Sequence, residues 1–400
     1  MKKLPEVYLK PFEEKRILNG HPWIYKSEIS SARNDVADGD IVLVRSGSNK
    51  KIGIGYFNCR SEITIRMLDI AKQNKKYYPP SDFAGFLRKK IINAIEKRNE
   101  IKNTEAIRMI FAEADGLPGL IVDKYKNCIV VQINTLGMEK LKDDVIKILS
   151  DVLSPEFIYE KSMSPLRIKE GLKTRQGLIY PENKKLEPFV IKENDISFKV
   201  DVVAGSKTGF YVDQRENREK LKNYVKGKRV LDCFCYTGGF SCYALKYGAQ
   251  NTTGIDLSQD ALKTAEENMK MNNFKNYRFI REDVFDALKR FVKEKEKFDV
   301  IILDPPAFSK SKNEKKGAIR GYSYLLLNSL KLLNKDGIII VFSCSNNVDY
   351  DDILFRAKKS ANKAGKKIKI IEKLMQSCDH PVIDNIPETF YLRGLTFKIL

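Results

Sequence analysis

Two side chains in this 400-residue sequence could act together in covalent chemistry, Cys344 and Asp304. Cys344 directly follows the apolar run GIIIVFS, and Asp304 opens the segment DPPAF (304–308) after another apolar run. A thiol is a strong nucleophile even when only partly ionised. A carboxylate followed by two rigid prolines is suited to accept from the amino or ring N–H groups of a flat base.

Cytosine suits this pair of side chains. Carbon 5 of a pyrimidine is a poor nucleophile, but addition of a thiolate to carbon 6 lets carbon 5 attack an electrophilic methyl group. In this interpretation Cys344 is the nucleophile, and Asp304 binds the N3/N4 edge and stabilises charge in the adduct. Pro305, Pro306 and Phe308 are the candidate substrate contacts. The alternative interpretation is that Cys344 is a small residue buried in the core with only a packing role.

These residues need a scaffold, and the pattern from about residue 200 onward predicts one. The apolar runs RVLDCF, NTTGIDL, YRFIRED, KFDVIILD and GIIIVFSC alternate with helical segments. This alternation is typical of an α/β fold with a doubly wound, Rossmann-like parallel sheet. Ligands of such sheets bind outside the carboxyl ends of the strands. The residues that follow each run are therefore the candidates for binding.

Acidic residues and a glycine turn follow these runs. The turn DCFCYTGGF (232–240) lets the backbone approach a ligand, Asp256 is placed for ribose hydroxyls, and Asp283 for an adenine amino group. Each acid alone could instead cap a helix. A site for a nicotinamide dinucleotide is the competing interpretation. It would require a third glycine in the turn, and it would not account for the DPP segment. The predicted cofactor contacts are Asp232, Phe234, Tyr236, Thr237, Gly238, Asp256, Asp283 and Asp304.

The pattern predicts three domains, with boundaries at 1–72, 73–195 and 196–400. Short strands and glycine turns predict a small β-barrel at the N-terminus, with Trp23 in its core. A polar linker (72–82) leads to a central α+β domain. There we expect a strand over 108–114, a helix over 138–150 and a hairpin over 189–201.

Composition narrows the class of protein. Lys and Arg outnumber Asp and Glu by 72 to 52, a net charge of +20 that favours a polyanionic partner, although the lysines are spread along the chain. Seven cysteines without a C-x-x-C pair and only two histidines indicate no metal site. No apolar run reaches the roughly 20 residues that span a bilayer, and no signal peptide is evident. We therefore expect a cytoplasmic protein with no membrane partner.

Four segments resemble the RlmI-type ribosomal RNA large-subunit cytosine-C5 methyltransferases. They are GHPWIY (20–25), ADGLPGLIVD (114–123), KTGFYVDQR (207–215) and DHPVI (379–383). The resemblance implies an N-terminal PUA domain that binds RNA and a class I methyltransferase domain that uses S-adenosyl-L-methionine. It also implies large-subunit (23S) ribosomal RNA as partner, 5-methylcytosine as product, Cys344 as nucleophile and Gln214 closing over the cofactor.

Two other functions remain open at this point. A related guanine-N7 branch, or another base-nitrogen methyltransferase, would use Asp304 without covalent catalysis. A non-catalytic RNA-binding assembly protein would not need acids at four strand ends. Where other RNA cytosine methyltransferases have a second cysteine, this sequence has Ala307, so the group that removes the C5 proton is not identified. Homodimer formation and the modified cytosine are also left open.

Overall fold

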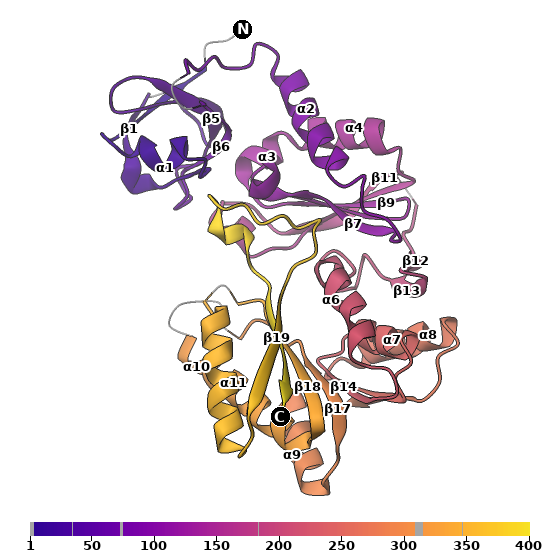
Figure 1. Ribbon diagram of the computed structural model, residues 1–400. Helices are drawn as coiled ribbons and strands as arrows, with labels where there is room; N and C mark the ends of the chain where they lie inside the picture. Colours follow the sequence, from indigo (N-terminus) through magenta and orange to yellow (C-terminus); the bar gives the residue numbers. More distant parts are fainter. Residues whose placement is uncertain (1–3, 34, 73–74, 183, 309–314, 346) are drawn as a thin grey trace. The chain divides into compact units, whose positions relative to one another are not determined.

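The computed structural model describes residues 4–400 apart from 34, 73–74, 183, 309–314 and 346, and it forms two compact units (Figure 1). Unit 1 comprises Met1–Ile191, Val200–Val212 and Asp379–Thr389. Unit 2 comprises Lys192–Lys199, Asp213–Cys378 and Phe390–Leu400. Each unit is built from chain segments that lie far apart in the sequence.

Unit 1 begins with a six-stranded sheet in the order β2-β6-β5-β4-β1-β3. Its elements are β1 (Glu6–Leu9), α1 (Glu14–Leu18), β2 (Trp23–Ile24), β3 (Ile29–Ala32), β4 (Ile41–Arg45), β5 (Lys51–Phe57) and β6 (Ile65–Ile70). Val7, Ile24, Val44 and Ile65 are fully buried in its core. Trp23 is only partly buried, and its indole N–H donates to Glu113 at 3.0 Å.

A second sheet of unit 1 has the order β11-β10-β9-β8-β7. Its strands and the accompanying helices are α2 (Phe83–Glu96), β7 (Ala106–Phe111), β8 (Leu120–Tyr125), β9 (Cys128–Ile133), α3 (Leu136–Lys140), α4 (Lys142–Leu153), β10 (Phe157–Ser162), α5 (Leu166–Lys169) and β11 (Arg175–Tyr180). The side chain of Asp82 caps α2 by accepting from Gly85 N–H. Tyr56 of β5 belongs to the same buried cluster as Leu120 and Val131 of this sheet. The division at residue 72 stays a prediction.

Two sequence-based boundaries in this region were wrong. The strand expected over 108–114 ends at Phe111, because Ala112–Asp115 turns into a 3-10 helix. The Asp115 carboxylate accepts from the backbone N–H of Phe111 and so closes this turn. The single helix expected over 138–150 is two helices, α3 and α4, which meet at Leu141.

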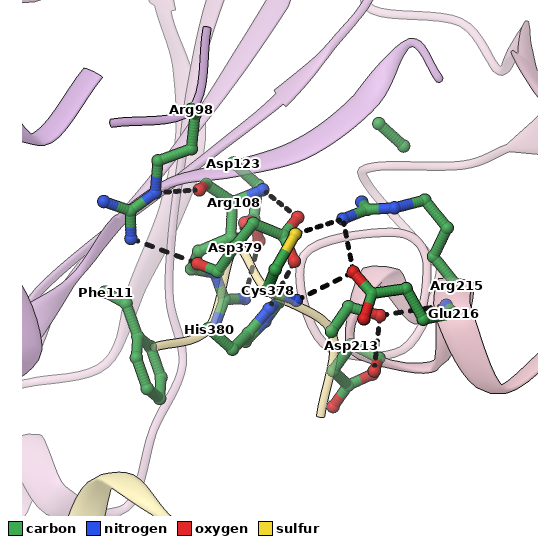
Figure 2. A network of polar contacts seen from close by, with 12 residues as sticks. Arg98, Arg108, Phe111, Asp123, Asp213, Arg215, Glu216, Cys378, Asp379 and His380 are labelled. Carbon is green, nitrogen blue, oxygen red and sulfur yellow. Dashed lines mark hydrogen bonds and ion pairs between the residues drawn. The ribbon is translucent and has the colours of Figure 1, made fainter. Parts of the chain in front are cut away.

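Hydrogen bonds join the DHPVI segment to two buried ion pairs of unit 1 (Figure 2). Arg98 forms a bidentate ion pair with Asp115, with N–O distances of 2.7 and 2.8 Å, and it also donates to the backbone carbonyl of Asp379. Arg108 pairs with Asp123 in the same way, and its backbone N–H donates to the Asp379 carboxylate. Because these side chains are all buried, each charge depends on its partner.

Unit 2 contains a seven-stranded sheet in the order β16-β15-β14-β17-β18-β20-β19. Its strands are β14 (Arg229–Cys233), β15 (Asn251–Asp256), β16 (Tyr277–Arg281), β17 (Phe298–Leu303), β18 (Leu333–Ser343), β19 (Ile368–Met375) and β20 (Arg393–Ile399). The first five strands in chain order pair in parallel, and β20 runs antiparallel to both of its neighbours. The doubly wound, Rossmann-like prediction is confirmed, and the structure adds β19 and β20 to the five predicted strands.

Helices flank this sheet (Figure 1). They are α6 (Arg215–Glu219), α7 (Gly239–Lys246), α8 (Gln259–Met271), α9 (Val284–Glu294), α10 (Lys315–Leu332) and α11 (Tyr350–Lys363). Leu288, Leu325 and Ala357, from α9, α10 and α11 respectively, are buried in one apolar core with strand residues such as Ile301 and Val341. In the described part of the chain, no helix is both long and apolar enough to cross a membrane.

The predicted hairpin is present as β12 (Phe189–Glu193) and β13 (Ile196–Val200), which Asn194 and Asp195 join with positive φ angles of 45° and 60°. Within unit 2, Glu193 accepts three hydrogen bonds from the guanidinium group of Arg218 and a fourth from the hydroxyl of Tyr243. The hairpin turn is therefore anchored beside α7.

Removing a buried cation in unit 1 tests the ion pairs. We expect Arg98→Met to lower the free energy of unfolding of unit 1 by about 3 kcal/mol, because it leaves the Asp115 carboxylate buried without its main partner. Arg88→Met is the matched control, since Arg88 and Asp151 form a pair that is 45% and 47% exposed, and it should cost less than about 1 kcal/mol. Urea unfolding followed by circular dichroism measures both, and equal effects would contradict a special role for the buried pair.

Candidate active site

Parallel pairing brings the predicted residues to one edge of the sheet. Cys233 at the end of β14 is level with Ile255 of β15 and with Leu303 of β17, and Leu303 is level with Val341 of β18. The segments that follow these strands therefore start side by side. Asp232 and Asp256 lie at the ends of β14 and β15 themselves, and Phe234 to Gly238, Asp304 to Phe308 and Cys344 lie in the segments that follow the strands.

The turn after β14 has an unusual backbone conformation. Phe234, Tyr236 and Gly238 all have positive φ angles, of 64°, 48° and 75°. Gly238 is the N-cap of α7, where a left-handed conformation favours glycine. Thr237 is buried, and its carbonyl accepts from the amide of Asn268 at 2.9 Å. The turn after β14 is thus a tight one, with three left-handed residues within five positions.

Two carboxylates hold this turn in place. Asp232 is 1% exposed and accepts from the backbone N–H and the hydroxyl of Ser241. Asp256 accepts from the backbone N–H groups of Tyr236 and Ser258, both at 2.9 Å. Asp232 therefore connects β14 to the first turn of α7, and Asp256 connects the end of β15 to the turn after β14.

The acids after β16 have structural partners. Asp283 caps α9 by accepting from the backbone N–H of Phe285 at 2.8 Å. Glu282 pairs with Arg290 at 2.6 Å. The helix-capping role that the sequence left open for these acids is therefore correct for one oxygen of Asp283. Its other oxygen retains acceptor capacity, because an ionised carboxylate can accept several hydrogen bonds.

Gln214 lies against Asp304. Its side-chain amide N–H donates to the Asp304 carboxylate at 3.0 Å, and its carbonyl oxygen accepts from Asn217 at 2.6 Å. Asn217 in turn donates to the carbonyl of Met375. Gln214 is 3% exposed, so this chain of hydrogen bonds fixes the orientation of its amide. The KTGFYVDQR segment therefore reaches the sheet edge through its glutamine.

Cys344 is half-buried, and its Sγ atom lies 3.9 Å from the carbonyl oxygen of Pro305. Pro306 is exposed and Phe308 half-buried. Three other cysteines near the turn, Cys233, Cys235 and Cys242, are buried, and burial raises the pKa of each thiol well above its usual range. Among these four thiols, only that of Cys344 is partly open to solvent.

Sequence reasoning missed Asn217, Ser241 and Tyr322. Tyr322 of α10 is 1% exposed, and its ring packs edge-on against Phe308 at 5.3 Å. Burial raises the pKa of its hydroxyl well above the usual range, and the charges of Cys344 and Asp304 raise it further. Tyr322 is therefore a protonated phenol in the surroundings of both. No local signal distinguishes it from the other aromatic residues of a buried helix.

Negative charge accumulates at this edge. Burial, together with the nearby charges of Asp304 and Asp256, raises the pKa of the Asp232 carboxyl to about 7, and the hydrogen bonds from Ser241 only partly oppose this shift. Its Oδ1 atom is buried and has no hydrogen-bond partner among the described residues. No group of three metal-ligating side chains occurs in the described ranges. The edge is suited to a ligand that brings hydrogen-bond donors or positive charge.

Comparison with known proteins identifies the scaffold. The family model of S-adenosylmethionine-dependent methyltransferases matches residues 176–397, and that of the PUA-like domain matches residues 7–69. The chain belongs to the S-adenosylmethionine-dependent methyltransferases. This membership confirms the predicted fold class and cofactor, and unit 2 holds the methyltransferase sheet.

Relatives of this methyltransferase match it along nearly the whole chain. Ribosomal RNA large subunit methyltransferase I of Aeromonas hydrophila is 39% identical over 398 residues, which cover 98% of each chain. The proteins of the same name from Vibrio cholerae and Alteromonas mediterranea are 37% and 35% identical and cover 99% and 98% of this chain, and 100% and 98% of their own lengths. The resemblance stated from the four sequence segments is therefore confirmed.

Solved structures agree on the fold. A Streptococcus mutans protein assigned as a SAM-dependent methyltransferase matches with a TM-score of 0.81 at 24% identity, over 98% of this chain and 99% of that one. A structure of a methyltransferase complexed with SAH matches with a TM-score of 0.83, also at 24% identity and with the same coverage. At this level of identity the likeness supports the architecture alone.

The Asp232 carboxyl makes stability depend on pH. Native Asp232 keeps its proton up to about pH 7, whereas the unfolded side chain loses it near the ordinary aspartate pKa of 3.8. Stability is therefore lost as the pH rises through this window. Asp232→Asn removes this dependence, so its free energy of unfolding relative to the native chain should rise by up to about 4 kcal/mol between about pH 4 and 7.

Urea unfolding of unit 2 at several pH values, without ligand, checks this expectation. Asp195→Asn is the control, because the Asp195 side chain is 99% exposed and its substitution should change stability by a small, pH-independent amount. A constant difference between Asp232→Asn and the native chain across the window would contradict the raised pKa.

Proposed function

We propose that this methyltransferase forms 5-methylcytosine in large-subunit (23S) ribosomal RNA, with Cys344 as the covalent nucleophile. The observation that carries the proposal is the placement of the Cys344 thiol, half-buried and 3.9 Å from the Pro305 carbonyl, beside the segment that Asp304 opens. The relatives named ribosomal RNA large subunit methyltransferase I supply the substrate class. A ribosomal RNA substrate implies an enzyme that works in the cytoplasm.

The residues at the sheet edge fit S-adenosylmethionine. The cofactor carries an ammonium group, a sulfonium charge, ribose hydroxyls and an adenine amino group, all of which favour acceptors or negative charge. The buried Oδ1 of Asp232, without a partner among the described residues, is such an acceptor. We assign binding of the cofactor to Asp232, Phe234, Tyr236, Thr237, Gly238, Asp256, Asp283, Asp304 and Gln214. When bound, it supplies an electrophilic methyl group.

Asp304 and the two prolines form the base-binding part of the site in this proposal. A carboxylate that already accepts from Gln214 has further lone pairs for the amino group of a cytosine. Phe308, held against Tyr322 by ring packing, offers an aromatic face beside it. Because a base inside a helix cannot reach such an edge, the target nucleotide is flipped out of its stack.

Cys344 activates the base. Its thiolate forms a bond to C6, and the electron pair displaced from the C5–C6 double bond makes C5 nucleophilic enough to be methylated. Removal of the C5 proton by a base then re-forms the double bond, and the electrons of the Sγ–C6 bond return to sulfur. Of the thiols near the turn, those of Cys233, Cys235 and Cys242 are unsuited to this role, because burial raises their pKa values.

Replacement of the thiol tests this mechanism. Cys344→Ala should lower the rate of cytosine methylation at least about a thousandfold, because C5 is no longer activated, and should leave S-adenosylmethionine affinity within about threefold. Cys59→Ser is the matched control, since Cys59 is an exposed thiol of unit 1, and it should keep full activity. Single-turnover methyl transfer to ribosomal RNA and calorimetry measure the two quantities. Retained turnover in Cys344→Ala would instead favour methylation of a base nitrogen.

A covalent trap provides a second test. RNA with 5-fluorocytosine at the target position should form a stable protein–RNA adduct with the native enzyme and S-adenosylmethionine, because fluorine cannot leave C5 as a proton does. Cys344→Ala should form no adduct, whereas Cys59→Ser should form as much as the native chain. Denaturing electrophoresis detects the adduct, and mass spectrometry locates it. An adduct at any other cysteine would overturn the assignment of Cys344.

A further inference from the structure

One side of α8 carries two asparagines, Asn268 and Asn272, that have no part in the proposed chemistry. Asn268 lies inside the helix and is 0% exposed, and Asn272 is the half-buried residue that ends it. Together with the buried Ala265 they occupy positions i, i+3 and i+7, so all three lie on one side of α8. Asparagine is a weaker helix former than alanine, and a buried amide is unfavourable unless it is hydrogen-bonded. Their hydrogen bonds must therefore explain their place.

The side chain of Asn268 joins two segments that are remote in sequence. Its amide N–H donates to the backbone carbonyl of Thr237, in the turn after β14, at 2.9 Å. Its carbonyl oxygen accepts from the backbone N–H of Lys199, in β13, at 2.8 Å. Because a backbone carbonyl only accepts and a backbone N–H only donates, a single orientation of this amide satisfies both partners. Asn268 thus forms a fixed link between β13 and the turn.

Asn272 contacts the same strand. Its carbonyl oxygen accepts from the backbone N–H of Ser197 at 2.8 Å, and its amide donates to the Ser197 carbonyl at 2.8 Å and to the backbone carbonyl of Asn268 at 2.7 Å. Among the described hydrogen bonds, those of the Asn272 side chain end at β13 and at α8 itself, whereas those of the Asn268 side chain also reach the turn after β14. The two asparagines therefore differ in one contact that matters for the turn.

The turn over residues 234–238 needs support from its neighbours. Phe234 and Tyr236 have left-handed backbone conformations, which are unfavourable for residues with a side chain and persist only where surrounding contacts hold them. Asp256 holds the turn from β15, through the backbone N–H of Tyr236. On the α8 side Gly238 approaches so closely that an added Cβ would lie 3.1 Å from the Cβ of Ala265. The conformation of the turn therefore depends on α8 as well as on the sheet.

We propose that Asn268 is a positioning residue for S-adenosylmethionine. Its amide holds the turn over residues 234–238 in the conformation that binds the cofactor, and it couples this turn to β13. Because its side chain is fully buried, Asn268 acts through the carbonyl of Thr237 and not by touching the cofactor. The inference rests on the assignment of this turn to the cofactor in the proposed function, and it is independent of Cys344 and of the target base.

An exchange of amide for carboxylate tests the link to Thr237. Asn268→Asp keeps an acceptor for the N–H of Lys199, but an ionised carboxylate cannot donate to a carbonyl. Calorimetry on the full chain without RNA should show about tenfold weaker binding of both S-adenosylmethionine and S-adenosylhomocysteine, as expected for the loss of one buried hydrogen bond. In methyl transfer to ribosomal RNA, KM for S-adenosylmethionine should rise by the same factor, while kcat and KM for RNA stay within about twofold.

Asn272→Asp is the matched control. It makes the same substitution about one turn further along α8 and removes the donors to Ser197 and to the Asn268 carbonyl, but it leaves the contact with Thr237 in place. Its cofactor affinity should stay within about twofold of the native value, a difference too small to count as the loss of a hydrogen bond. Asn268→Ala and Asn272→Ala repeat the comparison without a buried charge, and urea unfolding shows which variants are folded.

The native chain provides a test that needs no substitution. Coupling between two sites is reciprocal, so S-adenosylmethionine should slow hydrogen exchange not only in the turn but also at the backbone N–H of Lys199, which Asn268 accepts. Exchange in β4 of unit 1 is the control and should not change. Protection of the turn without protection at Lys199 would contradict the coupling, even if every variant of Asn268 failed to fold.

Other results would also overturn the inference. They are unchanged cofactor affinity in the Asn268 variants, equal losses in the Asn268 and Asn272 variants, and a fall in kcat without a change in cofactor affinity. Gly238→Ala separates this inference from the proposed function, because a Cβ at this residue, with its φ of 75°, would crowd Ala265 and Phe279 and disturb the turn directly. Weaker binding in Gly238→Ala alone would overturn only the role of Asn268. Unchanged binding in Gly238→Ala would overturn the assignment of the turn to the cofactor.

Discussion

Parallel pairing of β14, β15, β17 and β18 is the constraint on which the candidate active site depends. Neighbouring strands lie about 4.8 Å apart, so side chains at their carboxyl ends are brought together although they are far apart in sequence. A register shift of one residue would turn each of these side chains to the opposite face. The buried apolar residues of the strands, such as Ile301 and Val341, hold that register, so the core of unit 2 indirectly positions Cys344 and Asp304.

The meeting of these strand ends also brings several carboxylates together in a partly buried place. Backbone and side-chain hydrogen-bond donors offset the free-energy cost of removing these carboxylates from water. Asp256 and Asp283 accept from backbone N–H groups, and Asp304 accepts from Gln214. Asp232 is satisfied at one oxygen only: Oδ2 accepts from Ser241, whereas Oδ1 has no partner among the described residues, and the pKa of the carboxyl is raised to about 7. Such local conflict with stability is expected at a functional site. A donor-rich, positively charged cofactor would relieve it.

The two kinds of cation in this chain have different uses. Arg98, Arg108 and Arg218 are buried in two-pronged pairs with carboxylates, which suits the planar guanidinium group. Their charge is cancelled within the protein. By contrast, six exposed lysines line one hollow of unit 1 and form no ion pair among the described residues, so their charge adds to the field around the protein: Lys15, Lys50, Lys51, Lys72, Lys75 and Lys76. The net charge of +20 is therefore a poor guide to function until each cation is placed.

The sequence by itself determined the parallel sheet, the residues at its carboxyl edge and the nucleophile hypothesis, because apolar runs and the residues that end them are local features. Family membership and the cofactor followed from four short segments. Only the tertiary structure decided that Gln214 contacts Asp304 and that Tyr322 packs on Phe308. It also placed Lys72, Lys75, Lys76 and Tyr77 of the predicted polar linker in one hollow with residues of α1. These contacts join residues remote in sequence, and no local pattern records which side chains packing will bring together.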